Sequence, residues 1–143
     1  MIRYAKPTTV DEALALLGEG AWRVLAGGTD FYPAQGAKPF RDNVLDINGL
    51  AVLRGISETD DHFFIGARTT WTDLIRHPLP PAFDALKQAA REVGSPQIQN
   101  VASVAGNLCN ASPAADGVPG LLVLDAEVEL RSAAATRHLP LPD

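Results

Sequence analysis

The chain has 143 residues, of which 46% are hydrophobic and 20% are charged, and its formal net charge is −5. A chain of this size can bury the core of one domain, and its charged fraction argues against disorder. The acidic balance, without a Lys/Arg cluster, gives no support for binding to nucleic acid.

Targeting signals and metal ligands are sparse. No apolar run approaches the ~20 residues that span a bilayer. Asp11 and Glu12 arrive before any signal-peptide core, so we expect a cytoplasmic protein. Cys109 is the only cysteine, which excludes an internal disulfide and a four-cysteine iron–sulfur cluster within this chain. The three histidines lack the close spacing of a zinc site, so a metal site is disfavoured.

The N-terminal segment predicts a helix. Thr9 and Glu12 fit a capping box, in which each side chain bonds a backbone amide of the first turn. Apolar residues then recur at helical spacing over residues 10–17. Gly18 and Gly20 are expected to end this helix.

Two strands are expected next. Residues 22–26 are apolar and suit a short buried strand, after which Pro33 is tolerated in the first turn of a short helix. Residues 43–47 predict a second strand, closed by a turn at residues 48–49. This order is typical of a small α/β lobe, which we place at residues 1–52.

The pattern changes after residue 52. Residues 54–57 and 62–66 predict a hairpin around a polar loop at residues 58–61. Thr70 is expected to cap a short helix that ends before the proline-rich segment at residues 77–81.

The remaining elements complete a second lobe. Apolar spacing predicts an amphipathic helix over residues 83–93, and residues 116–124 predict a short helix despite their glycines and prolines. Alternation at residues 127–131 predicts a strand, and another begins near Arg137. We therefore expect an α+β lobe at residues 53–143 that is incomplete at its C-terminal end.

Two runs of small residues carry the functional prediction. The first covers residues 26–30 and the second residues 103–107, and neither matches G-x-G-x-x-G or a Walker A sequence. Backbone amides bared by glycine can bind a diphosphate without lysine or arginine.

Each run also has an ordinary structural interpretation. The first fits a strand-to-helix turn capped by Thr29 or Asp30. The second fits a β-bulge or a strand-to-turn transition packed on a neighbour, in which Gly106 permits positive φ. Polar side chains follow the second run. Among them, Asp116 fits either a ribose contact or a helix cap.

Four stretches, at residues 24–30, 65–67, 94–100 and 101–116, closely resemble the FAD-binding subunit or domain of the molybdenum hydroxylases. This is the xanthine dehydrogenase and carbon monoxide dehydrogenase family, whose flavin domain is of the vanillyl-alcohol-oxidase (PCMH) type. The resemblance runs from Tyr4 to about Asp143 and keeps the motifs in the family's order. It implies a two-lobed α+β FAD-binding domain, C-terminally truncated here.

The resemblance also implies the site. In that family two loops hold the diphosphate of non-covalently bound FAD between two subdomains, and Cys109 is expected as a small buried neighbour. Carried over residue by residue, the implied cofactor-binding residues are Val24, Leu25, Ala26, Gly27, Gly28, Thr29, Asp30, Ser103, Val104, Ala105, Gly106, Asn107, Cys109, Asn110 and Asp116.

Two departures from the family pattern stand out. Ala105 replaces a glycine of many members, and family members continue well beyond this C-terminus. The implied function is electron relay: a molybdopterin-containing large subunit oxidises the substrate, a 2Fe–2S small subunit passes electrons on, and FAD delivers them to NAD or another acceptor. The alternatives are a truncated structural or assembly module without productive FAD binding, and an unrelated α/β domain.

Overall fold

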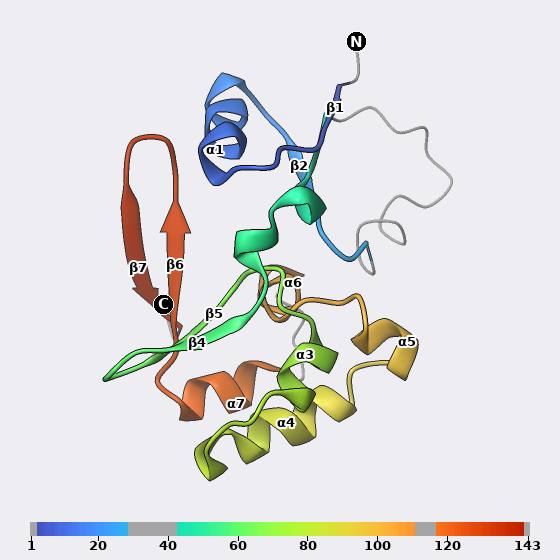
Figure 1. The fold of residues 1–143 in the computed structure, drawn as a ribbon, viewed down its shortest axis with the longest axis vertical. Coiled ribbons are helices and arrows are strands. Elements are labelled where there is room, and N and C mark those ends of the chain that lie inside the picture. The colour runs from blue at the N-terminus through green and yellow to red at the C-terminus, as the bar shows by residue number, and fades with distance from the viewer. Residues whose placement is uncertain (1–2, 29–42, 111–116, 142–143) are drawn as a thin grey trace.

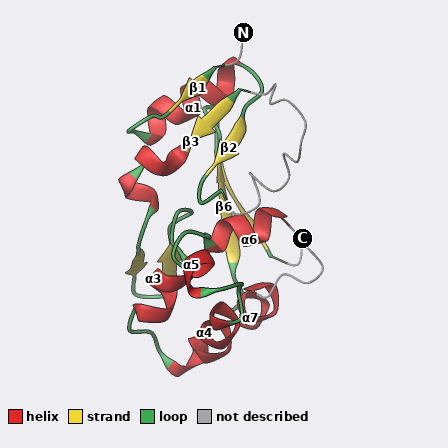
Figure 2. Ribbon diagram, turned by 90° about the vertical axis from the view of Figure 1, so that its right-hand side faces the viewer, coloured by secondary structure: helices red, strands yellow, loops and turns green. Residues whose placement is uncertain are grey.

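The computed structural model describes residues 3–28, 43–110 and 117–141 (Figure 1). The short helix expected around Pro33 lies outside these residues. In Figures 1 and 2 a small sheet with one helix forms one end of the molecule, and a group of helices forms the other. Within the described ranges, no helix is both long enough and apolar enough to cross a membrane.

The N-terminal sheet is parallel and has the order β1-β3-β2. Its strands are β1 (Tyr4–Ala5), β2 (Arg23–Leu25) and β3 (Val44–Asp46), and α1 (Val10–Glu19) connects the first two. The central strand β3 is buried at all three positions. The edge strand β2 is buried only at its last residue, and Val24 is 50% exposed. The strand predicted within residues 22–26 is present, but it is only partly buried, because an edge strand has a sheet neighbour on one side only.

The N-terminus of α1 is capped as predicted, with one difference. The Thr9 hydroxyl accepts a hydrogen bond from the Glu12 amide at 3.2 Å. The Glu12 carboxylate accepts from the Thr8 amide at 3.5 Å, one residue before the cap. The helix ends at Glu19 with Gly20 as its C-cap, so the predicted end is confirmed at Gly20, whereas Gly18 lies inside the helix.

The predicted hairpins and helices of the second half are present. Thr70 and Asp73 form a complete capping box at the start of α3. Two short 3₁₀ turns, Ile47–Gly49 and Ala51–Leu53, lead into this half. Its elements are β4 (Ile56–Glu58), β5 (Phe63–Ile65), α3 (Trp71–Arg76), a 3₁₀ turn (Pro81–Phe83), α4 (Asp84–Arg91), α7 (Gly117–Val123), β6 (Glu127–Arg131) and β7 (Thr136–Pro140), with β4–β5 and β6–β7 antiparallel.

Two short helices were not predicted, α5 (Pro96–Gln99) and α6 (Val104–Asn110). Ser103 makes a single antiparallel bridge to Thr70, and α6 begins at the next residue. Gly106 is therefore helical, whereas the described glycines with positive φ are Gly28, Gly55 and Gly94. In both views α6 lies between the N-terminal sheet and the helices α4 and α7 (Figures 1 and 2). The interpretation of residues 103–107 as a β-bulge is wrong beyond Ser103.

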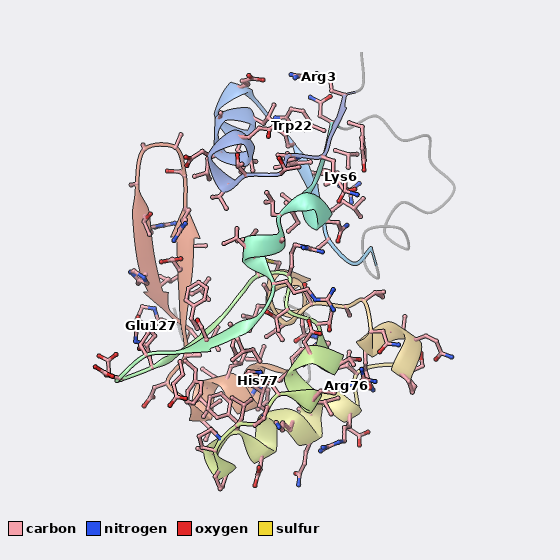
Figure 3. All side chains as sticks on the ribbon, in the orientation of Figure 1. Arg3, Lys6, Trp22, Arg76, His77 and Glu127 are labelled. Atoms are coloured by element: carbon pink, nitrogen blue, oxygen red, sulfur yellow. The ribbon has the colours of Figure 1, made fainter. Side chains whose placement is uncertain are left out.

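The largest core lies in the second half. Trp71, Leu74 and Leu86 are fully buried and pack with Val104 and Leu121. Trp71 is thus a packing residue. At the other end of the molecule Arg3 lies over the ring of Trp22, 5.1 Å from the ring centroid (Figure 3).

The division at residue 53 stays a prediction. Hydrogen bonds join the two sides of this boundary, since Arg68 Nη1 and the Leu53 amide each donate to the Leu50 carbonyl at 3.1 Å.

Leu86→Ala is expected to lower the free energy of unfolding by about 2–5 kcal/mol, because it leaves a cavity where α7 approaches α4. Gly120 of α7 lies so close that an added Cβ would stand 3.0 Å from Leu86 Cα. The control Val52→Ala alters a side chain that is 72% exposed and is expected to change stability by less than about 0.5 kcal/mol. Chemical denaturation of both variants measures this, and equal losses would contradict the placement of the core.

Candidate functional site

A hollow of about 260 Å³ lies where the two glycine-containing runs meet. Three of the predicted site residues line it, and six other residues complete its wall. The lining residues are Ala26, Gly27, Asn48, Arg54, Arg68, Thr70, Asn100, Val101 and Ser103.

The main chain of the first run lies against residues 101–102, which lead directly into the second run. A Cβ atom added to Gly27 would stand 2.1 Å from the carbonyl oxygen of Val101 and 2.8 Å from its carbonyl carbon. No real Cβ tolerates such a distance, so only glycine allows this approach. Gly28 has φ 81°, in the left-handed region that favours glycine. The first run therefore needs both glycines to lie against the segment that precedes Ser103.

A polar network holds the first run in place. The side-chain amide of Asn48 donates to the Ala26 carbonyl at 2.7 Å and to Asp46 Oδ1 at 2.8 Å. The Asn48 backbone amide also donates to Asp46 Oδ1, at 2.9 Å, and the Tyr4 hydroxyl donates to Asp46 Oδ2. The buried Asp46 carboxylate thus orients Asn48, and Asn48 fixes the main chain next to Gly27.

This network sets the charge state of Asp46. Burial alone raises the pKa of Asp46, but the hydrogen bonds from Tyr4 and Asn48 outweigh it. The pKa therefore lies below its ordinary value of 3.8, and the group is an anion at neutral pH.

Several backbone amides of the second run donate hydrogen bonds within the fold. The Val104 amide donates to the Thr69 carbonyl at 3.0 Å, and the Asn107 amide donates to the Ser103 carbonyl at 3.1 Å. The Gly106 amide donates to the Ser103 hydroxyl at 2.9 Å. These three amides are engaged, which contradicts the expectation that the second run acts as a loop of available amide donors. The Ser103 hydroxyl keeps its own hydrogen to donate.

The structure places the other predicted site residues in different surroundings. Leu25 and Val104 are buried, Val104 within the main core, whereas Val24 is half exposed. Ala105, Gly106 and Asn107 are partly buried in α6, and Asn107 Oδ1 lies buried without a hydrogen-bond partner among the described residues.

Cys109 is exposed, so the expectation of a buried cysteine is wrong. Thr29, Asp30 and Asp116 lie outside the described residues. Asn110 belongs to α6, but its side chain lies outside the described part.

Sequence reasoning missed the basic side chains of the site. Arg54 and Arg68 both line the hollow, and none of its nine lining residues is a carboxylate. Arg54 is neutralised by Asp73, with Nε to Oδ2 at 2.8 Å and Nη2 to Oδ1 at 3.0 Å. The sequence did point to two of the missed lining residues. Arg68 directly follows residues 65–67, a stretch that resembles the family, and Asn100 ends another such stretch.

Comparison with known proteins identifies the family. The family model described as "FAD binding domain in molybdopterin dehydrogenase" matches residues 1–143. The chain belongs to this family. The domain is 39% identical over 147 residues to the nicotinate dehydrogenase FAD-subunit of Eubacterium barkeri. It is 37% identical over 142 residues to the putative xanthine dehydrogenase FAD-binding subunit of Escherichia coli (strain K12).

These matches span nearly all of the FAD-binding domain, 98% and 96% of its residues, but 49% of each relative. The chain therefore spans about half the length of the curated relatives it matches. The predicted family and its cofactor, FAD, are confirmed.

Solved structures confirm the fold class. Carbon monoxide dehydrogenase from Hydrogenophaga pseudoflava matches with a TM-score of 0.87 and 32% identity, over 99% of the domain and 50% of that chain. Quinoline 2-oxidoreductase from Pseudomonas putida 86 matches with a TM-score of 0.88 over 99% of the domain and 50% of that chain. At 19% identity, the second likeness concerns the fold alone.

The described residues fit the diphosphate part of FAD. Gly27 leaves main chain bare at the hollow, a guanidinium and several hydroxyl and amide groups surround it, and no lining carboxylate repels an anion. Its volume of about 260 Å³ is below the ~300–1,000 Å³ of typical ligand sites. The hollow therefore suits one portion of FAD rather than the whole molecule. In the described part of the chain, no cluster of three or more His, Cys, Asp or Glu side chains is arranged to hold a metal ion.

Gly27→Ala is expected to destabilise the domain by about 1–3 kcal/mol, because the new methyl group collides with the Val101 backbone. The matched control is Gly18→Ala in α1, where an added Cβ meets nothing within 4 Å. This control is expected to stabilise the domain by about 0.5–1 kcal/mol through helix propensity. Unfolding free energies of both variants provide the measurement, and a neutral Gly27→Ala would mean that the two runs are not in contact.

The lowered pKa of Asp46 predicts a pH dependence. A carboxylate with a depressed pKa contributes stability above its unfolded-state pKa and loses that contribution as the pH falls through its folded-state pKa. Stability is expected to decline below about pH 4 in the wild type, less steeply in Asp46→Asn, and with an intermediate slope in Tyr4→Phe. Unfolding free energies measured from pH 7 to pH 3 test this, and three parallel curves would contradict it.

Proposed function

We propose that this FAD-binding domain holds FAD non-covalently, with the diphosphate in the hollow between the two glycine-containing runs. The main-chain contact between Gly27 and Val101 carries this proposal, because it brings the two runs to one place. In this proposal Ala26, Gly27 and Gly28 line the diphosphate with backbone, and Ser103 donates its hydroxyl from the opposite side.

The domain itself positions the cofactor. When bound, FAD supplies the capacity to accept and pass on electrons. Asn48 donates a hydrogen bond to the Ala26 carbonyl, which lessens the repulsion between this oxygen and a bound anion, and Asp46 keeps Asn48 in place. No residue of this chain is assigned as a general acid, general base or nucleophile.

The wider role is also part of the proposal. We infer that the domain belongs to a molybdenum-hydroxylase-type oxidoreductase, with a molybdopterin-containing large subunit and a 2Fe–2S small subunit as partners, and with NAD or another molecule as acceptor. Support comes from the relatives, which include the carbon monoxide dehydrogenase medium chain of Hydrogenophaga pseudoflava. The names of the relatives mention xanthine, nicotinate and carbon monoxide, so no substrate is proposed. The cytoplasmic location stays a prediction.

Replacement of Gly28 is expected to remove flavin. Gly28→Val forces a β-branched residue to φ 81° beside the hollow, whereas the control Gly55→Val places the same side chain at φ 126° with open space around it. We expect Gly28→Val to lose most of its flavin absorption after reconstitution with FAD and Gly55→Val to retain it. Circular dichroism checks that both variants are folded.

Two results would contradict the proposed function. Equal flavin content in folded Gly28→Val and wild-type protein would place the site elsewhere. A wild-type protein that stays colourless with excess FAD would instead support the alternative of a structural module without productive FAD binding.

A further inference from the structure

We infer that Arg68 is a diphosphate-binding residue of the domain, an assignment that rests on the proposed FAD site. It goes beyond the two glycine-containing runs, because Arg68 belongs to neither of them. In the fold it directly precedes Thr69 and Thr70, whose backbone pairs with the start of α6.

Hydrogen bonds fix both the backbone and the guanidinium of Arg68. Its backbone amide donates to the Leu53 carbonyl at 2.7 Å, and its Nη1 donates to the Leu50 carbonyl at 3.1 Å. Leu50 is 1% exposed, so this acceptor belongs to a well-packed part of the molecule. A guanidinium fixed in this way loses little side-chain freedom when it binds a ligand.

The Nε–Nη2 edge of the guanidinium has no acceptor among the described residues. Arg68 Nε is buried and has no hydrogen-bond partner among the described residues. Because Nη1 faces the Leu50 carbonyl, the Nε–Nη2 edge is the part left for an incoming acceptor. This edge presents two parallel N–H donors, the geometry that pairs with two oxygens of a phosphate. A buried charged donor without an acceptor is costly, and a phosphate oxygen removes that cost.

The charge around the hollow favours Arg68 over Arg54 as the anion partner. Arg54 already forms a two-point pair with the carboxylate of Asp73. Within the described ranges, Arg68 forms no ion pair with a carboxylate, and none of the lining residues found there is acidic. The net charge of the whole chain is −5, so this local cation acts against the general repulsion of an anionic ligand.

The test uses Arg68→Met, which removes the charge, and Arg68→Lys, which keeps the charge but loses the two-point geometry. The matched control is Arg76→Met, because Arg76 lies on α3 beside His77 (Figure 3) and is not among the residues that line the proposed diphosphate hollow. The purified protein, freed of flavin, is titrated with FAD at several salt concentrations. ADP, which carries the diphosphate without the flavin ring, is used as a competitor.

We expect Arg68→Met to raise the dissociation constants for FAD and ADP by about tenfold to hundredfold, as for loss of a hydrogen-bonded charge. Arg68→Lys is expected to fall between Arg68→Met and the wild type, and Arg76→Met to stay within about twofold of the wild type. The dissociation constant for FAD should rise with salt in the wild type and rise less in Arg68→Met. A purely structural role of Arg68 would leave this salt dependence unchanged.

The binding results distinguish failure of the proposed FAD site from failure of the proposed role of Arg68. A wild-type protein that binds neither FAD nor ADP rejects the proposed function itself. Normal wild-type binding with an unchanged affinity or an unchanged salt dependence in Arg68→Met rejects the role of Arg68 alone. If Arg68→Met does not fold, the decision falls to Arg68→Lys and to the wild-type salt series, and a flat series rejects the role.

Discussion

The close approach of the Gly27 backbone to the Val101 backbone is the constraint on which the site depends. It joins the end of an edge strand in the N-terminal sheet to the segment that leads into α6. A side chain at Gly27 would push these segments apart and open the hollow between them. Asn48 holds the neighbouring Ala26 carbonyl by a hydrogen bond. Ser103 and Arg68 line the same hollow.

Although the chain is acidic, none of the described residues that line this hollow carries a carboxylate. Asp46 and Asp73 are both near it, yet each carboxylate is occupied by hydrogen bonds within the fold. Asp46 accepts hydrogen bonds from Tyr4 and Asn48, and Asp73 accepts them from Arg54 and from the N-terminus of α3. The carboxylates therefore position groups around the hollow, while the groups that line it are neutral or basic, which is the polarity that suits a diphosphate.

Local signals in the sequence predicted the elements that depend on local chemistry. Thr9 and Thr70 cap their helices, and the hairpin around residues 58–61 forms as expected. Helix α6 was not predicted because Gly106 lowers helix propensity. The helix is stabilised by the cap from Ser103 and by packing of Val104 against core residues that are distant in the sequence. The position of Arg68 depends on carbonyls of residues 50 and 53, a tertiary arrangement that no local pattern reveals. The resemblance to the family supplied what composition and periodicity did not, namely FAD.

A crystal structure of the protein with FAD tests the central claim most directly. We expect the diphosphate to lie in the hollow, between the backbone of Gly27 and the hydroxyl of Ser103, and the contact between Gly27 and Val101 to persist. FAD bound with its diphosphate away from this hollow, or with residues 27 and 101 separated, would contradict the proposed site.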